Sequence, residues 1–365
     1  MKNKTAIITW VTYCNFGTFL QAYALQRYLM DLGITNTILD DSSMIISPIN
    51  LKYRLKKFLM RISNTDYRKF EHSIKQANRL FGYFKNELLN IDKDILNLSS
   101  VNAKYDTFIC GSDQIWNPFS LENPNADYYY ASFTTKKKIA YAPSIGVSEV
   151  PQQYKEKLKK LTSCFDFLSA REQQGVDILR ELTGKEVVKV VDPTLLLDRE
   201  QWNVLLPKNV PCEENYILAY FLTPNIVFIN AALEYARKKG LRLKMFFLDK
   251  SYKRYDCDLI TAGPIEFLHY VRDAKCLFTD SFHGSIFASI FHTQFFTFKR
   301  FKQTVKNQNS RVENLLKIMN ISERLLDEEN YNNINELSDI DFSSVDYNLG
   351  PFIKKSKEYI KKAIQ

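Results

Sequence analysis

Residues 5–39 read TAIITWVTYCNFGTFLQAYALQRYLMDLGITNTIL, and this stretch sets the expected fold class. Thr5–Val11 is a short apolar run typical of a buried strand, and Thr18–Leu32 has the length and apolar spacing of a helix. Gly33 follows where a helix commonly ends, and Thr35–Leu39 predicts the next strand. Strand, helix and strand in this order predict a βαβ unit and therefore a parallel sheet.

The same alternation continues along the chain to about residue 300. Further apolar runs predict strands at 106–110, 138–142, 165–169, 187–191, 216–222, 241–248, 275–279 and 294–298. Helical spacing predicts helices between the later strands, at 225–239, 264–274 and 285–291. We therefore expect an α/β protein built from two facing Rossmann-like domains, with mostly parallel sheets and a cleft between them.

Domain boundaries follow from the spacing of these strands and from composition. We expect an N-terminal domain over 1–165, with a basic helical insertion at 51–90, and a C-terminal domain over 166–345. A basic amphipathic helix is expected at 346–365. The length of 365 residues fits two domains, and 45% hydrophobic with 25% charged residues excludes a disordered or collagen-like chain.

The cysteines and the first apolar run bear on metal binding and compartment. The six cysteines include no C-x-x-C pair, so zinc-type spacing is absent and we expect no metal centre. Isolated cysteines in apolar runs are typical of a reducing compartment. Asn15 and Gln21 interrupt the first apolar run before it could form a signal or membrane segment, so we expect a cytoplasmic protein.

The net charge of +9 is concentrated in two segments. Residues 51–89 hold ten Lys/Arg and three Asp/Glu, which gives +7, and residues 351–365 hold five Lys and one Glu, which gives +4. Apolar stripes accompany both segments, at Leu51–Ile62 and along Ile353–Ile364. This pattern fits helices lying on an anionic membrane and equally fits solvated helices that pack on the protein core. Peripheral association with the inner face of the cell membrane is therefore one of two open interpretations.

Compact polar clusters follow six of the predicted strands. Ligands of parallel α/β sheets bind at the carboxyl ends of the strands, so recurring clusters there predict one shared site. The candidate residues are Asn15, Gly17, Ser112, Asp113, Gln114, Trp116, Ser144, Arg171, Glu172, Asp192, Asp280, Ser281, His283, Gly284 and Ser285.

His283 and Arg171 are the candidates with the clearest chemistry. His283 lies between a predicted strand and a helix, and because histidine titrates near neutral pH this position favours catalysis or ligand binding. Arg171 directly follows a buried strand, and it fits either a structural ion pair with Glu172 or a bidentate clamp for carboxylate or phosphate. Asp192 fits an Asx turn at least as well as a functional role.

Two loops of the N-terminal half suggest binding of a sugar or an anion. Asn15 and Thr18 fit a helix cap and equally fit a cradle for a ligand at the helix N-terminus. Only Gly17 is available for a G-x-G-x-x-G fingerprint, which argues against NAD. Gly111–Pro118 is rich in turn formers, yet its polar side chains beside Trp116 favour a carbohydrate platform.

In combination these motifs resemble the polysaccharide pyruvyl transferase family. The matching stretches are the Asn15–Gly17 loop with LQAYAL at 20–25, Gly111–Pro118, Ser169–Glu172, Asp192–Thr194, Asp280–Gly284 and Asn309–Arg311. The resemblance implies a glycosyltransferase-B-like fold with the donor in the C-terminal domain and the acceptor in the N-terminal domain. It implies transfer of pyruvate from phosphoenolpyruvate, as co-substrate without a further cofactor, to a hydroxyl pair of a capsule, lipopolysaccharide or exopolysaccharide repeat.

The implied reaction needs a general acid, a general base, and cations for a carboxylate and a phosphate. We expect Arg171 to bind an anionic end of the donor. His283 would be the acid or would contact the departing phosphate, and Glu172 or Asp113 would be the base. Arg311 would be a second anion contact.

Other functions of the same architecture stay open at this point. In the pyruvyl transferase the helix N-terminus at Ser285 would help to neutralise the departing phosphate. A nucleotide-sugar-dependent glycosyltransferase of the same architecture is the alternative enzyme. A non-catalytic glycan-binding protein would show no turnover. The expected partners are phosphoenolpyruvate and a glycan or lipid-linked oligosaccharide, and an anionic membrane surface is left open as a further partner. Nucleic acid is not expected, because the basic residues are not interleaved with stacking aromatics on a known motif.

Overall fold

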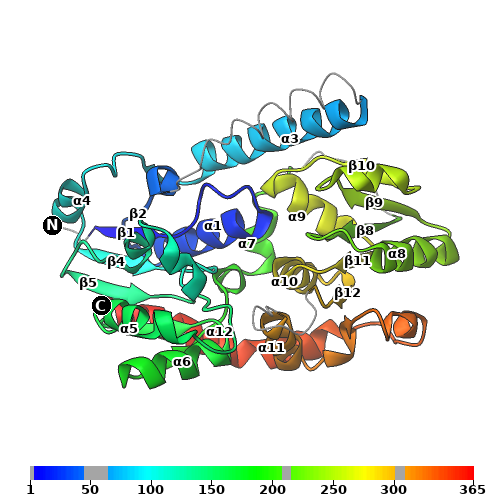
Figure 1. Cartoon of the computed structure of the whole chain (residues 1–365). Coiled ribbons are helices and arrows are strands. Elements are labelled where there is room, and N and C mark those ends of the chain that lie inside the picture. The colour runs from blue at the N-terminus through cyan, green and yellow to red at the C-terminus, as the bar shows by residue number, and fades with distance from the viewer. Residues whose placement is uncertain (1–3, 45–64, 208–214, 301–308) are drawn as a thin grey trace.

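Two parallel β-sheets lie side by side in the computed structural model, which describes residues 4–44, 65–207, 215–300 and 309–365 (Figure 1). The N-terminal sheet has the strand order β3-β2-β1-β4-β5, and the C-terminal sheet has the order β10-β9-β8-β11-β12-β13. The strand pairs are parallel, and helices pack around both sheets. This architecture confirms the expected α/β class with two facing Rossmann-like sheets.

The strands are short, and those at the centre of each sheet are buried. They are β1 (Thr5–Ile8), β2 (Asn36–Leu39), β3 (Ile91–Asp92), β4 (Thr107–Cys110), β5 (Lys137–Ala140), β6 (Leu168–Ala170), β7 (Val187–Lys189), β8 (Tyr216–Tyr220), β9 (Arg242–Phe246), β10 (Asp258–Ile260), β11 (Cys276–Thr279), β12 (Gln294–Phe298) and β13 (Leu325–Leu326). The helices are α1 (Phe16–Asp31), α3 (Thr65–Tyr83), α4 (Leu98–Lys104), α5 (Gln152–Thr162), α6 (Gln173–Thr183), α7 (Arg199–Asn203), α8 (Ile226–Lys239), α9 (Pro264–Asp273), α10 (Phe282–Phe291), α11 (Ser310–Met319) and α12 (Phe342–Ile364).

The central strands β1 and β8 mark where the strand order of each sheet reverses. In β1, Ile7 lies opposite Ile38 of β2 and Ile109 of β4. In β8, Leu218 lies opposite Leu277 of β11. Such buried, apolar runs suit a parallel sheet covered by helices on both faces. The crevice beyond the carboxyl end of the reversal strand is where α/β folds bind ligands, so the topology places one such crevice in each half.

β6 and β7 form a two-stranded sheet that lies beside β5 of the N-terminal sheet. Ile139 of β5 bridges to Phe167 in the parallel sense, and the Ala140 amide donates to the Phe167 carbonyl at 2.9 Å. β7 then pairs with β6. An apolar run predicts a strand without showing which neighbours the strand will have, so the contact of β6 with β5 could not be predicted from the sequence.

The described part of the basic segment contains a helix, α3, that reaches across to the C-terminal half (Figure 1). Its Phe70 ring packs edge-on against Phe247 with centroids 5.0 Å apart, and its Asp66 pairs with Lys253 at 2.7 Å. The apolar stripe expected at Leu51–Ile62 lies outside the described residues.

The C-terminal helix α12 starts in the C-terminal half and ends beside the N-terminal sheet (Figure 1). The Tyr359 hydroxyl donates to the Ala140 carbonyl at 2.8 Å. Ile360 is fully buried, and Ile353 and Ile364 pack against the same apolar core. The interpretation of this stripe as membrane-facing is therefore wrong, because its apolar side is covered by protein.

One apolar core runs through both halves. The Phe16 ring, from the start of α1, packs against Tyr220, Phe246 and Phe267 of the C-terminal half with centroids between 4.7 and 5.4 Å apart. These contacts fix the beginning of α1 against the second sheet. Within the described ranges, none of the helices combines the length and the apolar character that crossing a membrane would require.

Candidate active site

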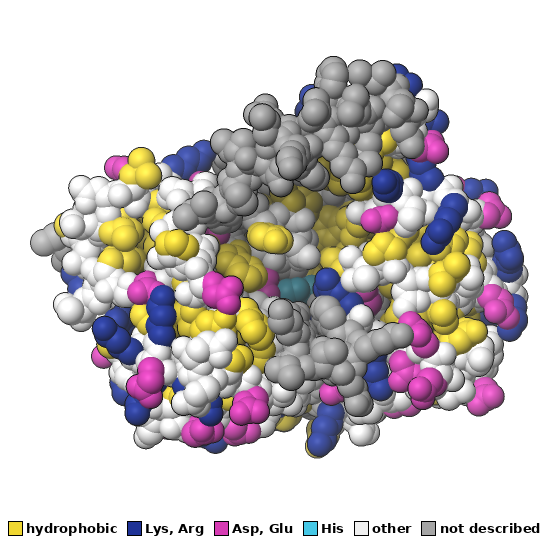
Figure 2. All heavy atoms as spheres, viewed as in Figure 1, with side chains coloured by type: hydrophobic (Ala, Val, Ile, Leu, Met, Phe, Trp, Pro, Cys, Tyr) yellow, Lys and Arg dark blue, Asp and Glu magenta, His cyan; other side chains and the backbone are white. Residues whose placement is uncertain are grey.

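A cleft of about 510 Å³ opens at the carboxyl ends of both sheets. Its N-terminal wall includes Asn15, Thr18, Asp113 and Gln114, and its C-terminal wall includes Asp280, Ser281, His283 and Arg311. Figure 2 shows basic side chains and a histidine together in the hollow between the two halves. Polar residues expected from separate strand ends are thus brought to one place.

Helix α1 begins in this cleft and packs directly on the catalytic candidate His283. The Asn15 side chain accepts from the Thr18 amide at 3.3 Å, and the Thr18 hydroxyl donates to Asp113 at 2.7 Å. Gly17 has no room for a side chain, because a Cβ there would lie 2.0 Å from Nδ1 of His283. The cap and the close approach therefore both position the N-terminus of α1 against the imidazole.

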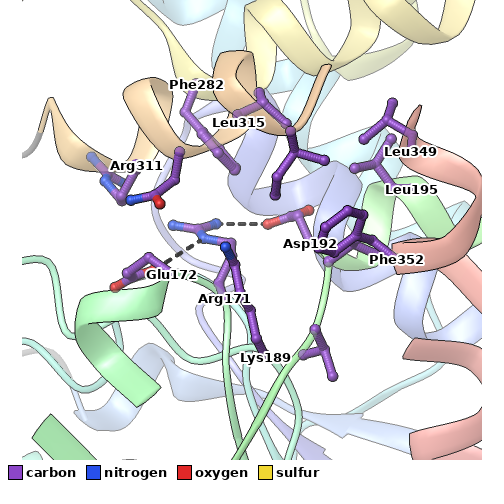
Figure 3. A pocket seen from close by; sticks show the side chains of 14 residues that line it. Arg171, Glu172, Lys189, Asp192, Leu195, Phe282, Arg311, Leu315, Leu349 and Phe352 are labelled. Carbon is purple, nitrogen blue, oxygen red and sulfur yellow. Dashed lines mark hydrogen bonds and ion pairs between the residues drawn. The ribbon is translucent and has the colours of Figure 1, made fainter. Parts of the chain in front are cut away.

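Arg171 lies in a group of carboxylates behind the cleft (Figure 3). Its Nη1 donates to Asp192 Oδ2 at 2.6 Å, its Nε lies 3.8 Å from Glu172, and its Nη2 lies 4.0 Å from Asp113. The guanidinium also lies over the Phe282 ring, 4.4 Å from its centroid. Burial by itself lowers the pKa of Arg171, but the three carboxylates, Asp192 first, outweigh burial and raise that pKa above its ordinary value.

Asp192 connects this guanidinium to the histidine. His283 Nε2 lies 3.5 Å from the Asp192 oxygen that also binds Arg171, and Thr194 donates twice to the other oxygen. Burial raises the pKa of Asp192, yet His283, Arg171 and Thr194 together hold it well below its ordinary value. Among the described residues, Nε2 of His283 and two nitrogens of Arg171 find no hydrogen-bond partner. Buried donors without partners are rare and favour a role in ligand binding.

Arg311, at the first turn of α11, lies close to Arg171 and Arg300. Burial first, and then the charge of Arg171, lower the pKa of Arg311 to about 10, while Asp113 and Glu172 act in the opposite direction. Arg311 lines both the cleft and the small chamber drawn in Figure 3. Arg311 thus lies between Arg171, which lines the chamber, and Arg300, which lines the cleft, and an anion bound beside Arg311 would reduce the repulsion between these guanidinium groups.

Asp280 and Ser281 shape the opposite wall at the start of α10. Asp280 accepts from the amides of Leu222 and Thr223 at 2.7 and 3.1 Å. Burial nevertheless raises the pKa of Asp280 to about 6, since those bonds and nearby Arg300 only partly offset the loss of water. Ser281 caps α10 by accepting from the Gly284 amide at 3.2 Å. Asp280 is thus a carboxyl that exchanges a proton close to neutral pH.

Glu172 and Ser144 hold a loop rather than line the cleft. Glu172 Oε1 accepts from the Ser144 hydroxyl at 2.8 Å and from the amides of Ile145 and Gly146 at 2.9 and 3.2 Å. The second oxygen, Oε2, has no hydrogen-bond partner among the described residues and lies 3.8 Å from Arg171 Nε. Glu172 lines the small chamber beside Arg171, whereas Asp113 lines the cleft.

Trp116 does not offer an aromatic face to any ligand, and this expectation is wrong. The side chain is 0% exposed, its indole N–H donates to the Tyr129 carbonyl at 3.0 Å, and its ring stacks on Tyr130 with centroids 5.2 Å apart. Trp116 belongs to the core of the N-terminal half. The turn-forming residues around Trp116 predict an exposed loop, but the ring itself points into the core.

Three other candidates are also parts of the packing. Ser112 is fully buried, and its hydroxyl donates to the Ala142 carbonyl at 2.7 Å. A Cβ on Gly284 would lie 2.5 Å from Thr279 Oγ1, so this glycine allows α10 to pack on β11. Ser285 is fully buried and lies within hydrogen-bond distance of another core hydroxyl. All three residues stabilise the ends of strands that lie next to the cleft.

Sequence reasoning missed several residues that line the cleft, among them Trp10, Tyr13, Lys299 and Arg300. Lys299 and Arg300 directly follow β12, so the strand-end argument could have found them. Trp10 was included in the first strand, whereas β1 ends at Ile8. Across the ranges that the structure describes, no three His, Cys, Asp or Glu side chains are grouped so that they could hold a metal ion.

A comparison with known families identifies the family of this chain. A family model described as polysaccharide pyruvyl transferase matches residues 15–300, which is most of the chain. The protein is therefore a transferase-class α/β protein, and the chain belongs to the polysaccharide pyruvyl transferase family. No curated protein matches the chain.

Solved structures of similar fold include two UDP-N-acetylglucosamine 2-epimerases and a protein solved with UDP. A UDP-N-acetylglucosamine 2-epimerase is 12% identical, with 99% of this chain and 95% of that chain covered and a TM-score of 0.53. The S. aureus MnaA–UDP structure is 14% identical, with coverage of 98% and 92% and a TM-score of 0.52. The Methanocaldococcus jannaschii UDP-GlcNAc 2-epimerase is 12% identical, with coverage of 100% and 99% and a TM-score of 0.50. At such identities the likeness shows the glycosyltransferase-B-like fold alone.

Proposed function

We propose that the protein transfers a pyruvyl group from phosphoenolpyruvate to two hydroxyls of one sugar in a bacterial surface polysaccharide repeat, forming a ketal. The observation that carries the proposal is the buried His283–Asp192–Arg171 group beside a cleft that Arg300 and Arg311 also line. Membership of the family supports the same class of reaction.

The anionic donor fits the charges of the cleft. Phosphoenolpyruvate carries a carboxylate and a phosphate, and guanidinium groups bind both in bidentate geometry. The caps of three helices also line the cleft: Asn15 of α1, Ser281 of α10 and Asn309 of α11. Amides at helix N-termini and their dipoles favour anions, so the helices and the arginines act in the same direction.

The chemistry requires one proton to be donated and two to be removed. A proton added to the methylene carbon of phosphoenolpyruvate makes the neighbouring carbon electrophilic, and one sugar hydroxyl adds there and loses its proton. Phosphate then leaves with the bonding electron pair, and the second hydroxyl adds to the same carbon and loses its proton. The products are the ketal and one phosphate.

The geometry supports particular side chains for these roles. His283 is the proposed acid, because it lines the cleft and its Nε2 lies 3.5 Å from the Asp192 carboxylate, which can hold the imidazole in place. Arg171 is a positioning residue that holds Asp192 in its ionised form. Asp113 is the proposed base, since it lines the cleft on the wall where we place the acceptor.

A phosphate-release assay tests the proposal. The acceptor would be surface polysaccharide from which mild acid has removed the ketal, and the product ketal methyl group would be followed by proton NMR. We expect phosphate and ketal in equal amounts, also after chelator treatment. His283→Gln should lower kcat at least ~10²-fold, the scale of a lost acid, whereas His292→Asn, remote from the cleft, should not. Phosphate without ketal would contradict the proposal.

Titration calorimetry separates this reaction from its rivals. We expect heat from phosphoenolpyruvate and none from UDP-glucose or UDP-N-acetylglucosamine. Binding of a UDP-sugar alone would instead indicate a nucleotide-sugar-dependent glycosyltransferase. Glycan binding without any donor would indicate a non-catalytic glycan-binding protein.

Membrane attachment, where it occurs, would rest on charge. The exposed lysines of α12 face away from the core that covers the apolar side of the helix; they are Lys354, Lys355, Lys361 and Lys362. Each cation near an anionic surface is worth ~1 kcal/mol, and salt weakens the attraction. We expect co-sedimentation with phosphatidylglycerol vesicles at low salt only. Equal, negligible pelleting at low and high salt would remove the membrane from the proposal.

A further inference from the structure

An aromatic pair stands at the mouth of the cleft on its N-terminal wall. Tyr13, in the loop between β1 and α1, is 64% exposed and lines the cleft. The Trp10 ring stacks against it, with centroids 5.9 Å apart and planes 28° from parallel. One ring supports the other from the protein side, so the outer ring presents a flat apolar face.

The loop that carries this pair is anchored. The buried Asp41 carboxylate accepts from the Val11 amide at 3.2 Å, from the Thr12 hydroxyl at 2.5 Å and from the Tyr129 hydroxyl at 3.0 Å. The Tyr129 ring also meets Trp10 edge-on at 6.4 Å. A side chain held in place before binding loses little conformational entropy on binding, which favours recognition.

The surroundings of the pair indicate its ligand. Asp113 and Gln114 line the same wall, whereas the cations Lys299, Arg300 and Arg311 line the C-terminal wall. The cleft therefore separates a wall suited to an anion from a wall with a flat aromatic face and hydrogen-bonding groups. A pyranose ring matches the second wall, because its axial C–H groups form an apolar face and its hydroxyls lie at the rim.

We infer that Tyr13, supported by Trp10, is the stacking platform for a sugar ring of the acceptor. The inference rests on the proposed function for the identity of the acceptor, but the platform itself is a carbohydrate subsite that can be measured without turnover. It replaces Trp116 as the aromatic of the site and orients the sugar so that its hydroxyl pair faces Asp113.

Saturation-transfer NMR with methyl β-D-galactopyranoside and methyl β-D-glucopyranoside tests the platform directly. We expect at least one of these glycosides to bind, and Tyr13→Ala to weaken its binding about tenfold. Tyr13→Phe should stay within about twofold of wild type, since it keeps the ring. Tyr347→Ala is the matched control, because Tyr347 is 83% exposed but lies on α12 away from the cleft. Equal binding by wild type and Tyr13→Ala, or no binding of either glycoside by wild type, would overturn the inference.

Turnover measurements keep the two proposals apart. In the phosphate-release assay, Tyr13→Ala should raise the KM for the depyruvylated polysaccharide about tenfold and leave the KM for phosphoenolpyruvate unchanged. Tyr13-dependent glycoside binding without any reaction of phosphoenolpyruvate would leave the platform in place and overturn the donor. An unchanged acceptor KM in Tyr13→Ala would overturn the platform while the transferase stands.

Discussion

At the scale of single residues, the buried charge of Arg171 is stabilised by neighbouring carboxylates rather than by water. It is buried, and its shortest contact is the 2.6 Å pair with Asp192. Without Asp192, the guanidinium would face Glu172 and Asp113 at 3.8 and 4.0 Å. Removing one partner of a buried pair costs more than removing one at the surface, because the remaining charge cannot recover its water.

We expect Asp192→Asn to lower the free energy of unfolding by about 3–5 kcal/mol at pH 7, measured by urea denaturation. Asp258→Asn is the control, because its pair with Arg242 is exposed and should matter little. Equal stability of Asp192→Asn and Asp258→Asn would contradict the account of a buried ion pair.

The raised pKa of Asp280 predicts that its contribution to the free energy of unfolding changes with pH in the opposite sense to that of an aspartate whose pKa is lowered on folding. Its folded-state pKa is about 6 against an ordinary value of 3.8, so the folded state holds the proton more tightly. Its contribution to stability is present below pH 4 and is lost as pH rises through 6. Relative to Asp280→Asn, the wild-type free energy of unfolding should fall by about 3 kcal/mol over this range, measured by urea denaturation. Parallel pH curves for the two proteins would exclude the raised pKa.

Residue type predicted chemistry better than it predicted exposure. His283, Asp113 and Arg311 line the cleft as expected, because strand-end position and side-chain chemistry together indicate a site. The prediction that Trp116 contacts a carbohydrate is wrong, because a loop rich in turn formers can still direct one ring into the core. Tyr13 was not identified, since nothing in the local pattern distinguishes an exposed ring on a loop from a buried one.

At the scale of elements, the site depends on where helices begin. α1, α10 and α11 come from distant parts of the sequence, and their first turns meet at the cleft. Gly17 is the closest approach between two of them, because α1 passes against the imidazole on α10. The helix starts therefore position the catalytic candidate as well as supplying positive dipole ends.

Gly17→Ala should move the His283 ring, since the new methyl group would lie 2.0 Å from Nδ1. A displaced catalytic group can cost about 10²-fold, and we expect a fall of this order in kcat in the phosphate-release assay. Gly82→Ala in α3 is the matched control, because its added methyl meets nothing within 4 Å, and it should keep full activity. A fully active Gly17→Ala protein would show that the contact does not constrain the histidine.

Most of the elements, but not their partners, could be predicted from periodicity. The long apolar runs correspond to strands such as β1, β8 and β11, because burial on both faces leaves a continuous signal. β3, β10 and β13 were missed, since each has only two or three residues and lies towards a sheet edge. Attachment of β6 to the N-terminal sheet depends on tertiary contacts that no local pattern encodes.

At the scale of the whole molecule, two helices cross between the halves. α3 leaves the N-terminal half and pairs with the C-terminal one through Asp66 and Phe70. α12 returns in the opposite direction, where the Val191 amide donates to Ser356 and the Tyr359 hydroxyl donates to Ala140, both at 2.8 Å. Together with the shared apolar core, these crossings join both walls of the cleft into one body.

We therefore expect a single cooperative thermal transition in calorimetry, with calorimetric and van't Hoff enthalpies equal. Removing residues 342–365 should abolish that transition, because α12 contributes Phe342, Val345, Leu349 and Ile360 to the core. Tyr359→Phe should keep one transition and lose about 1 kcal/mol, the worth of one hydrogen bond. Two separated transitions in the full chain would show instead that the halves unfold independently. In that case the cleft could open and close between them, and the short distances around His283 would describe only its closed form.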